Sequence, residues 1–347
     1  GQETIGGSMD AKTYGGKFSD SAGFVFNGRI YSGLQSVNKG NVASAILSMA
    51  NDTHLFSTSL MTESADNSEF SSGEILPSEY ERERIDLAYS FQGQDQEWNL
   101  SLAVNNTGDA GTPALPMDIQ SIDSKLLHVD HRWEVDAFNI LSSFSYNTIE
   151  HWMTNYDLRR PPQDTMMTQG IMRYRATFAE SDNYGFSLKI EQPLDNGLRR
   201  VGVDGHWSVH DADISNPNAM MFGISNFNQA ERNILGVFVE QEVGLSDGIG
   251  VEAGLRVNQV VMDAGKINAD LNPMGLTTGM PVMMNNMAAM LANGFNTHQL
   301  DHDDTNVDWF ARLSVESSSF MVWYLGAARK MRAPSYQERY LWLPMEA

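Results

Sequence analysis

Hydrophobic and polar residues alternate with a period of two along much of this chain. In the segment 184–191, for example, Phe186, Leu188 and Ile190 fall on one face of an extended chain, and polar residues fall on the other. Helical spacing fits none of the alternating stretches, so each predicts a β-strand. The clearest of them are the segments 85–92, 98–105, 184–191, 199–210, 251–258 and 307–316.

The connections between the predicted strands alternate between short and long. Short turns are expected near 51–52, 93–95, 195–197, 246–248 and 317–319. Between them lie long polar segments, at 65–79, 106–117, 150–182, 212–230 and 263–306. This pattern predicts about thirteen strands, in antiparallel hairpins that are tight at one end and long at the other. If the first strand, near 22–36, runs outward, every long segment falls on the extracellular side.

A soluble β-sandwich and a membrane barrel both show this alternation. Strands of about ten or more residues are long for a sandwich and suit a tilted membrane crossing. The polar face carries many Arg, Asp, Glu and His residues, which suits a wet lumen, and the long segments are all on one side. No run of 18 apolar residues is present, so no transmembrane helix is expected. The pattern therefore favours an all-β protein, an antiparallel transmembrane β-barrel.

Composition narrows the classes of partner and of chemistry. The 347 residues include 44 acidic and 23 basic ones, for a net charge of -21. Phosphate binding needs clustered Lys and Arg, so we expect no nucleic-acid partner, whereas an acidic surface suits cations or solubility. The absence of cysteine excludes disulfides and Cys-type zinc sites, and 20 methionines are an excess. We find no nucleophile elbow, P-loop, dinucleotide fingerprint or HExxH motif, so we do not expect an enzyme.

The stretch GAARKMRAPSYQERYLWLP carries the most specific motif of the chain. It resembles the barrel segment of TonB-dependent receptors that reads Arg-Ala-Pro-Ser-x-x-Glu. Five residues carry this resemblance: Arg332, Ala333, Pro334, Ser335 and Glu338. The stretch ETIGGSMDAKT looks like the end of the plug domain of that family. AGTPALPMDI, at 110–119, the MRYR at 172–175 and the ending SYQERYLWLP look closest to the copper-receptor branch.

In that family an N-terminal plug fills a barrel of about 22 strands. The resemblance implies the C-terminal end of the plug at residues 1–20 and a partial barrel at 21–347, in the outer membrane of a Gram-negative bacterium. Both chain ends look cut, so we expect an internal fragment. The implied partners are outer-membrane lipid, TonB (through a preceding N-terminal region) and a metal or metal chelate. No prosthetic group is implied, and copper is the expected transported ligand.

Methionines in two neighbouring long segments are the leading ligand candidates. Met166, Met167 and Met172 lie in the segment 150–182, and Met220 and Met221 lie in the next one. Thioethers prefer Cu(I), and loops that meet at one barrel mouth can combine their sulfurs. In the copper-receptor branch a methionine-containing site lies between plug and barrel. We therefore favour Met172, Met220 and Met221 as ligands, with loop packing as the alternative.

The stretch GMPVMMNNMAAML, at 279–291, holds five more methionines: Met280, Met283, Met284, Met287 and Met290. Their spacing places them on one face of a helix. We expect a short loop helix that packs this face on neighbouring loops, because methionine fills irregular gaps well. The alternative is a soft-metal surface, since helical spacing brings the sulfurs within reach of one cation.

Histidines are weaker candidates. His302 lies in the acidic segment 301–304, and His298 lies just before it. Both are secondary metal candidates, although we expect a solvated acidic loop. His206 and His210 share one face of a strand, but four residues of strand span about 13 Å. They cannot both coordinate one metal ion from a regular strand, and we expect them to line the lumen.

The sequence thus indicates a receptor for TonB-driven metal uptake, with copper ion or a copper complex as the first candidate. The same receptor type with an iron-siderophore or haem ligand is one alternative, and an ungated porin-like barrel is another. The methionine excess argues against siderophores, whose sites commonly use aromatic residues and Arg. The Arg-Ala-Pro-Ser motif and the plug-like start disfavour the porin-like barrel.

Overall fold

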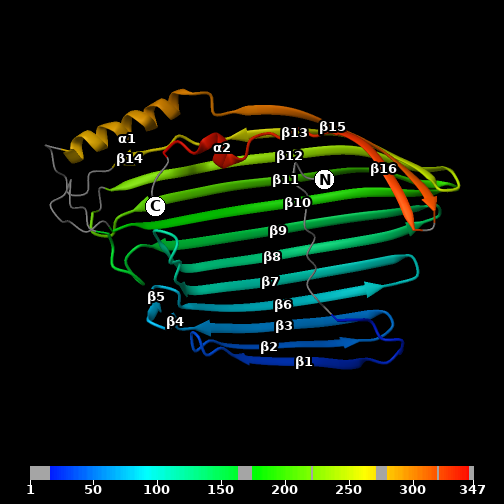
Figure 1. Ribbon diagram of the computed structural model, residues 1–347, viewed down its shortest axis with the longest axis horizontal. Helices are drawn as coiled ribbons and strands as arrows, with labels where there is room; N and C mark the ends of the chain where they lie inside the picture. The colour runs from blue at the N-terminus through cyan, green and yellow to red at the C-terminus, as the bar shows by residue number, and fades with distance from the viewer. Residues whose placement is uncertain (1–15, 163–173, 220–221, 271–279, 319, 344–347) are drawn as a thin grey trace.

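The computed structural model shows one large, curved antiparallel sheet (Figure 1). It describes residues 16–162, 174–219, 222–270, 280–318 and 320–343. Thirteen strands pair in chain order: β1 (Val25–Leu34), β2 (Asn41–Ala50), β3 (His54–Ala65), β6 (Tyr80–Gln92), β7 (Gln96–Ala110), β8 (Asp118–Val135), β9 (Phe138–Thr154), β10 (Ala176–Leu194), β11 (Gly197–Ser215), β12 (Gly223–Ser246), β13 (Ile249–Asp263), β15 (His302–Ser318) and β16 (Met321–Arg329). The predicted all-β antiparallel fold is confirmed, and β1 and β16 are its two open edges.

The short strands and the longer of two helices lie at one end of the sheet (Figure 1). The strands β4 (Ser68–Phe70) and β5 (Gly73–Ile75) form a separate hairpin, and β14 (Ala269–Asp270) pairs with β12. Two helices follow, α1 (Met280–Thr297) and α2 (Tyr336–Tyr340). No helix in the described part of the chain is long and apolar enough to cross a membrane. The predicted plug segment, 1–20, lies mostly outside the described residues, so that assignment stays a prediction.

The asymmetry of the connections is confirmed (Figure 1). Tight turns join the strands at one end, here called the turn end, as between Leu194 of β10 and Gly197 of β11. The long connections, with α1, β4, β5 and β14, gather at the opposite end, here called the loop end. All the candidate ligand segments therefore belong to the same end of the sheet.

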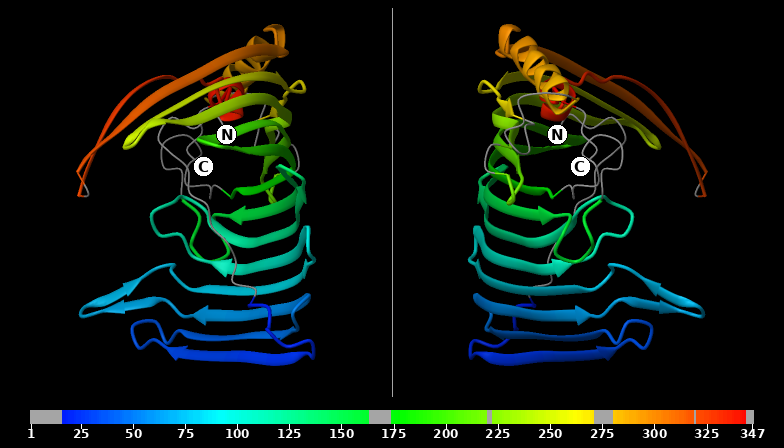
Figure 2. Two further views of the ribbon diagram at one scale, coloured as in Figure 1. Left: turned by 90° about the vertical axis from the view of Figure 1, so that its right-hand side faces the viewer. Right: turned by 90° about the vertical axis from the view of Figure 1, so that its left-hand side faces the viewer.

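The alternation of side chains separates two faces of the sheet. The ring of His210 on β11 stacks on Tyr336 of α2, 4.0 Å between ring centroids, and α2 lies on the concave side (Figure 2). Even-numbered residues of β11 therefore face the concavity, and Trp207 faces outward. Tyr184 and Leu188, on the outward face of β10, keep 45% and 40% of their surface exposed. An apolar convex face and a polar concave face follow from this pattern.

The predicted long loops at 106–117, 150–182 and 212–230 are shorter than expected, the first because β7 continues to Ala110. β9 continues to Thr154 and β10 begins at Ala176, and β11 and β12 likewise extend into the segment 212–230. Near the loop end, Glu180 of β10 lies directly opposite Glu150 of β9 and Asp211 of β11. Backbone pairing continues there although the outward residues are acidic, and for that reason the alternation rule missed these strand ends.

Two apolar clusters fill the concave side near the loop end. The first, which we call the wall cluster, contains Ala230, Val260, Met262, Ala333 and Tyr340. The second, which we call the loop cluster, contains Ile214, Ala219, Phe222, Ile224, Ala269 and Ala288, with Trp342 and Leu343 packed against it. These clusters join the strands to the long connections and so position the candidate site.

Candidate functional site at the loop end

The leading methionine candidates lie in segments whose flanks the structure describes. Met166, Met167, Met172, Met220 and Met221 themselves lie outside the described residues. The flanking residues nevertheless define where the two segments leave and re-enter the sheet. The geometry of these flanks therefore tests whether the two segments are neighbours.

The first segment is closed by a pair of residues at its base. The backbone N–H of Asn155 donates to the carbonyl oxygen of Arg175 at 3.1 Å, and the N–H of Arg175 donates to Asn155 Oδ1 at 2.8 Å. Arg175 then places its guanidinium 4.0 Å from the ring centroid of Phe222, a cation–π contact. Arg175 follows Met172 by three positions and Phe222 follows Met221 directly. The expected proximity of the two segments is thus confirmed for their flanks.

A third methionine-bearing segment meets the same point. Phe222 is 5% exposed and belongs to the loop cluster together with Ala288 of α1. Ala288 lies between Met287 and Met290 in the sequence, so the flanks of all three segments come together around Phe222. Soft thioether donors on converging segments suit a soft cation such as Cu(I).

The predicted helix around Met280–Met290 is confirmed, but its packing face is not the expected one. Met287 and Met290 are 60% and 65% exposed, whereas Ala288 and Ala292 are 2% and 5% exposed. The prediction that the methionine face packs is wrong for these two residues, because the small alanines allow closer approach of the helix to its neighbours. The side chains of Met280, Met283 and Met284 lie outside the described part of the structure.

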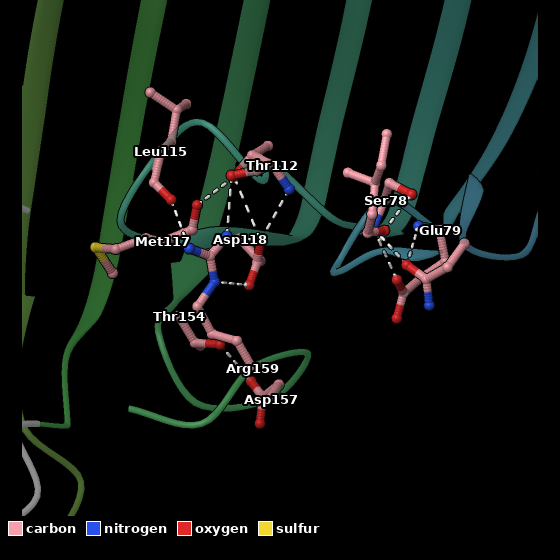
Figure 3. A network of polar contacts seen from close by, with 11 residues as sticks. Ser78, Glu79, Thr112, Leu115, Met117, Asp118, Thr154, Asp157 and Arg159 are labelled. Carbon is pink, nitrogen blue, oxygen red and sulfur yellow. Dashed lines mark hydrogen bonds and ion pairs between the residues drawn. The ribbon is translucent and has the colours of Figure 1, made fainter. Parts of the chain in front are cut away.

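A charged network fixes the connection between β7 and β8 to the start of the first segment (Figure 3). Arg159 donates from Nε to Asp118 Oδ2 at 2.5 Å and also from Nη2 to Asp118 Oδ1. The same guanidinium donates to the carbonyl oxygens of Leu115, at 2.6 Å, and Thr112, at 2.9 Å. The Asp118 side chain is only 1% exposed, so this ion pair is largely shielded from water.

A further methionine, Met117, lies beside this network and was not among the predicted site residues. It is 1% exposed, and its sulfur accepts a hydrogen bond from Thr177 Oγ1 at 3.5 Å. Its sulfur is therefore buried among protein atoms. The local sequence gave no sign of this, because the partner on β10 lies 60 positions away.

The histidine candidates have other partners. His298 is exposed, and its Nδ1 lies 2.6 Å from the carbonyl oxygen of Gly294. His302 packs against Tyr340, 6.4 Å between ring centroids. Within the described ranges, no group of three or more His, Asp or Glu side chains is arranged to hold a metal ion. The acidic segment 301–304 is instead tied to the fold, since Asp304 forms an ion pair with Arg339 at 3.0 Å.

The Arg-Ala-Pro-Ser motif builds the start of α2. Ser335 is the N-cap and accepts from the N–H of Glu338, while Glu338 accepts from the N–H of Ser335, a capping box. Arg332 donates to both carboxylate oxygens of Glu338, at 2.5 and 2.9 Å. These hydrogen bonds from Arg332 and Ser335 lower the pKa of Glu338 to about 2.

Comparison with known proteins agrees with this architecture. Residues 72–343 match the family model described as "TonB dependent receptor-like, beta-barrel". A search of curated proteins finds no match. A solved structure of the copper transporter OprC is similar with a TM-score of 0.71 at 18% identity, over 93% of this chain and 48% of that one. The ferric-catecholate import receptor Fiu from E. coli K12 is similar with a TM-score of 0.59 at 10% identity, over 92% and 56%. This chain thus spans about half the length of these two proteins.

Proposed function

Because this chain belongs to the TonB-dependent receptor-like β-barrel family, we propose that it forms part of the barrel of an outer-membrane receptor for TonB-driven uptake of copper ion or a copper complex. The convex apolar face would contact outer-membrane lipid, and the concave polar face would surround the plug. Transport is the activity proposed, and no catalytic step is part of it.

The observation that carries copper as the ligand is the meeting of three methionine-bearing segments. The described flanks of these segments, Arg175, Phe222 and Ala288, contact or cluster with one another. Thioether sulfur is a soft donor that favours Cu(I) over the harder iron ions of siderophore complexes. The similarity to the copper transporter OprC shows the shared fold, and copper is also what that protein transports.

The proposed ligands are the candidates that the sequence indicates, in the same order of preference. Met172, Met220 and Met221 are the leading candidates, with Met166 and Met167 beside them. Met287 and Met290 are exposed on α1 and would offer a first contact for copper at the loop end, together with Met280, Met283 and Met284. His298 and His302 are the remaining candidates. The net charge of -21 would raise the local concentration of cations around this mouth.

Copper would bind at the loop end, where the long connections gather, and would leave through the barrel after the plug moves. In members of this family, TonB supplies the energy for this step and acts on the region that precedes the plug. On the concave face of the described strands, ion pairs such as that between Arg256 and Asp204 would line the path of the ion through the barrel.

A transport assay in cells tests this proposal. The full-length receptor is produced in a strain lacking its own copy, with and without TonB, and the cells are offered copper, a ferric catecholate or haem at equal concentration. Copper accumulation that depends on both the receptor and TonB is expected. Accumulation of iron from the catecholate or from haem, without copper, would instead make it an iron receptor. Solute entry that is independent of TonB would indicate an ungated porin-like barrel.

A further inference from the structure

The segment 330–343, which we call the inner strap, follows β16 and lies across the concave side of the sheet (Figures 1 and 2). Its first residues are fixed to β15. Lys330 Nζ pairs with Asp308 Oδ2 at 2.5 Å, and the N–H of Met331 donates to Asp308 Oδ1 at 2.8 Å. Asp308 is 6% exposed, so the strap begins at a buried, charged anchor.

The middle of the strap is held by hydrogen bonds within its own motif and by contacts with the sheet. The capping box and the Arg332 pair hold α2, as described above. The carbonyl oxygen of Pro334 accepts from Arg232 Nε on β12 at 3.1 Å. Tyr340 is 2% exposed in the wall cluster, and its hydroxyl donates to the carbonyl oxygen of Leu300 at 2.8 Å.

The end of the strap reaches the loops that flank the methionines. Trp342 Nε1 donates to the carbonyl oxygen of Ser225 at 3.1 Å, and the side chains of Trp342 and Leu343 pack against the loop cluster. Ser225 lies three positions after Phe222, whose ring contacts the guanidinium of Arg175. Trp342 thereby connects the anchored strap to the point where the three methionine-bearing segments meet.

We propose that Trp342 is a positioning residue of the copper site, through which the Arg-Ala-Pro-Ser motif holds Phe222 and Ser225, which follow the candidate ligands in the sequence, in place for ligand binding. This inference rests on the proposed function, because it assigns a role relative to the methionines of that site. Preorganisation of a binding segment raises affinity by removing the entropic cost of ordering it. The motif would thus act on the ligand without touching it.

A purely stabilising role is the competing explanation. Trp342 is half-buried, and its removal would then lower the thermal stability of the barrel and leave the geometry of the site alone. Trp323 on β16 offers a control of the same residue type at the turn end, where its Nε1 donates to Ser317 Oγ at 3.3 Å. It differs from Trp342 in location, in its acceptor, which is a hydroxyl and not a backbone carbonyl oxygen, and in burial, since Trp323 is 62% exposed.

The test uses the full-length receptor and its Trp342→Ala, Trp342→Phe and Trp323→Ala variants. Hydrogen exchange is measured at Phe222, whose N–H donates to Ala219, and at Ser225, whose N–H donates to Asn268. Cu(I) affinity and the melting temperature are measured on the same samples. For Trp342→Ala we expect exchange at both amides and the Kd for Cu(I) to rise about tenfold or more, equivalent to about 1.4 kcal/mol. Trp342→Phe is expected to retain most of the packing and so to fall between, and Trp323→Ala to match the wild type in exchange and Kd.

The outcomes separate the inference from the proposed function. A wild-type receptor that binds no Cu(I) contradicts the proposed function and with it the copper role of Trp342, while faster exchange in Trp342→Ala would still show that the strap holds the loop. Unchanged exchange and affinity in Trp342→Ala would overturn the inference while leaving copper binding established. An affinity loss that merely tracks the melting temperature, with the same loss in Trp323→Ala, would also overturn it.

Discussion

Arg256 on β13 reaches past β12 and donates two hydrogen bonds to Asp204 on β11, from Nη1 at 2.7 Å and from Nη2 at 2.6 Å. Gly236 of β12 lies directly opposite Asp204 and makes this reach possible. A Cβ atom built on Gly236 would stand 2.1 Å from Arg256 Nη2 and 2.6 Å from Asn258 Oδ1. The sheet thus carries a shielded ion pair on its concave face, and this pair forms only because Gly236 has no side chain.

We predict that Gly236→Ala destabilises the barrel strongly. The added methyl group displaces the guanidinium and leaves Asp204 without its partner, and breaking a shielded ion pair costs about 3 kcal/mol or more. Denaturant unfolding of the full-length protein, followed by tryptophan fluorescence, measures the loss. Gly223→Ala is the control on the same strand, since nothing lies within 4 Å of its added Cβ. Equal stability of the two variants would contradict the role assigned to Gly236.

Arg159 is predicted to be irreplaceable by lysine. Its guanidinium serves both oxygens of Asp118 and the carbonyl oxygens of Leu115 and Thr112, which a single ammonium group cannot all reach in one plane. Both Arg159→Lys and Arg159→Ala should raise hydrogen exchange at the N–H of Thr112, which donates to Asp118 Oδ1. An increase of about tenfold or more is expected, equivalent to about 1.4 kcal/mol. Wild-type exchange in Arg159→Lys would show that charge alone suffices.

The motif at the start of α2 is predicted to survive mild acid. Hydrogen bonds from Arg332 and Ser335 lower the pKa of Glu338 to about 2, from an ordinary value near 4.3. A carboxyl group with a lowered pKa stabilises the folded state at pH values above its ordinary pKa. This contribution is lost as the pH falls through the lowered pKa of about 2. The carboxyl ¹³C shift of Glu338 should therefore titrate near pH 2. In Arg332→Gln its midpoint should rise toward about 4.3, and a wild-type midpoint already there would refute the pairing.

Methionine oxidation should follow burial in the described part of the chain. Met287 and Met290 on α1 are 60% and 65% exposed, and they should be converted to sulfoxide quickly by dilute peroxide. Met117 and Met262, at 1% and 0% exposed, should remain unmodified until the protein unfolds. Mass spectrometry of peptides taken at successive times gives the rates. Comparable rates for the two pairs would show that the helix face is assigned wrongly.

The helix around Met287 shows what the sequence could and could not predict at the site. The spacing of the methionines correctly indicated a helix, because the period of 3.6 is a local property of the chain. The predicted packing face was wrong, because Ala288 packs in the loop cluster with Phe222, which is far away in the sequence, and Ala292 is also buried. The Arg159–Asp118 pair is likewise 41 positions apart and leaves no local trace.

The same reasoning applies to the strands. Apolar and polar alternation predicted β10 and β11 where one face is apolar, as at Leu188 and Val201. It missed their ends, where Glu180 faces Asp211 across the two strands and the outward residues are no longer apolar. The short and long connections followed from the placement of polar segments, and so the asymmetry between the two ends of the sheet was predicted correctly.

Cu(I) affinity of the full-length receptor tests the central claim most directly. Met172, Met220 and Met221 are changed together to Leu, and Met49 and Met61, on strands β2 and β3, are changed to Leu as the control. Affinity is measured by competition with a Cu(I) chelator under reducing conditions. We predict that the triple variant loses Cu(I) binding by about a hundredfold or more, about 2.7 kcal/mol, and that the control binds like the wild type. Equal Cu(I) affinity in the triple variant and the wild type would contradict the proposed site.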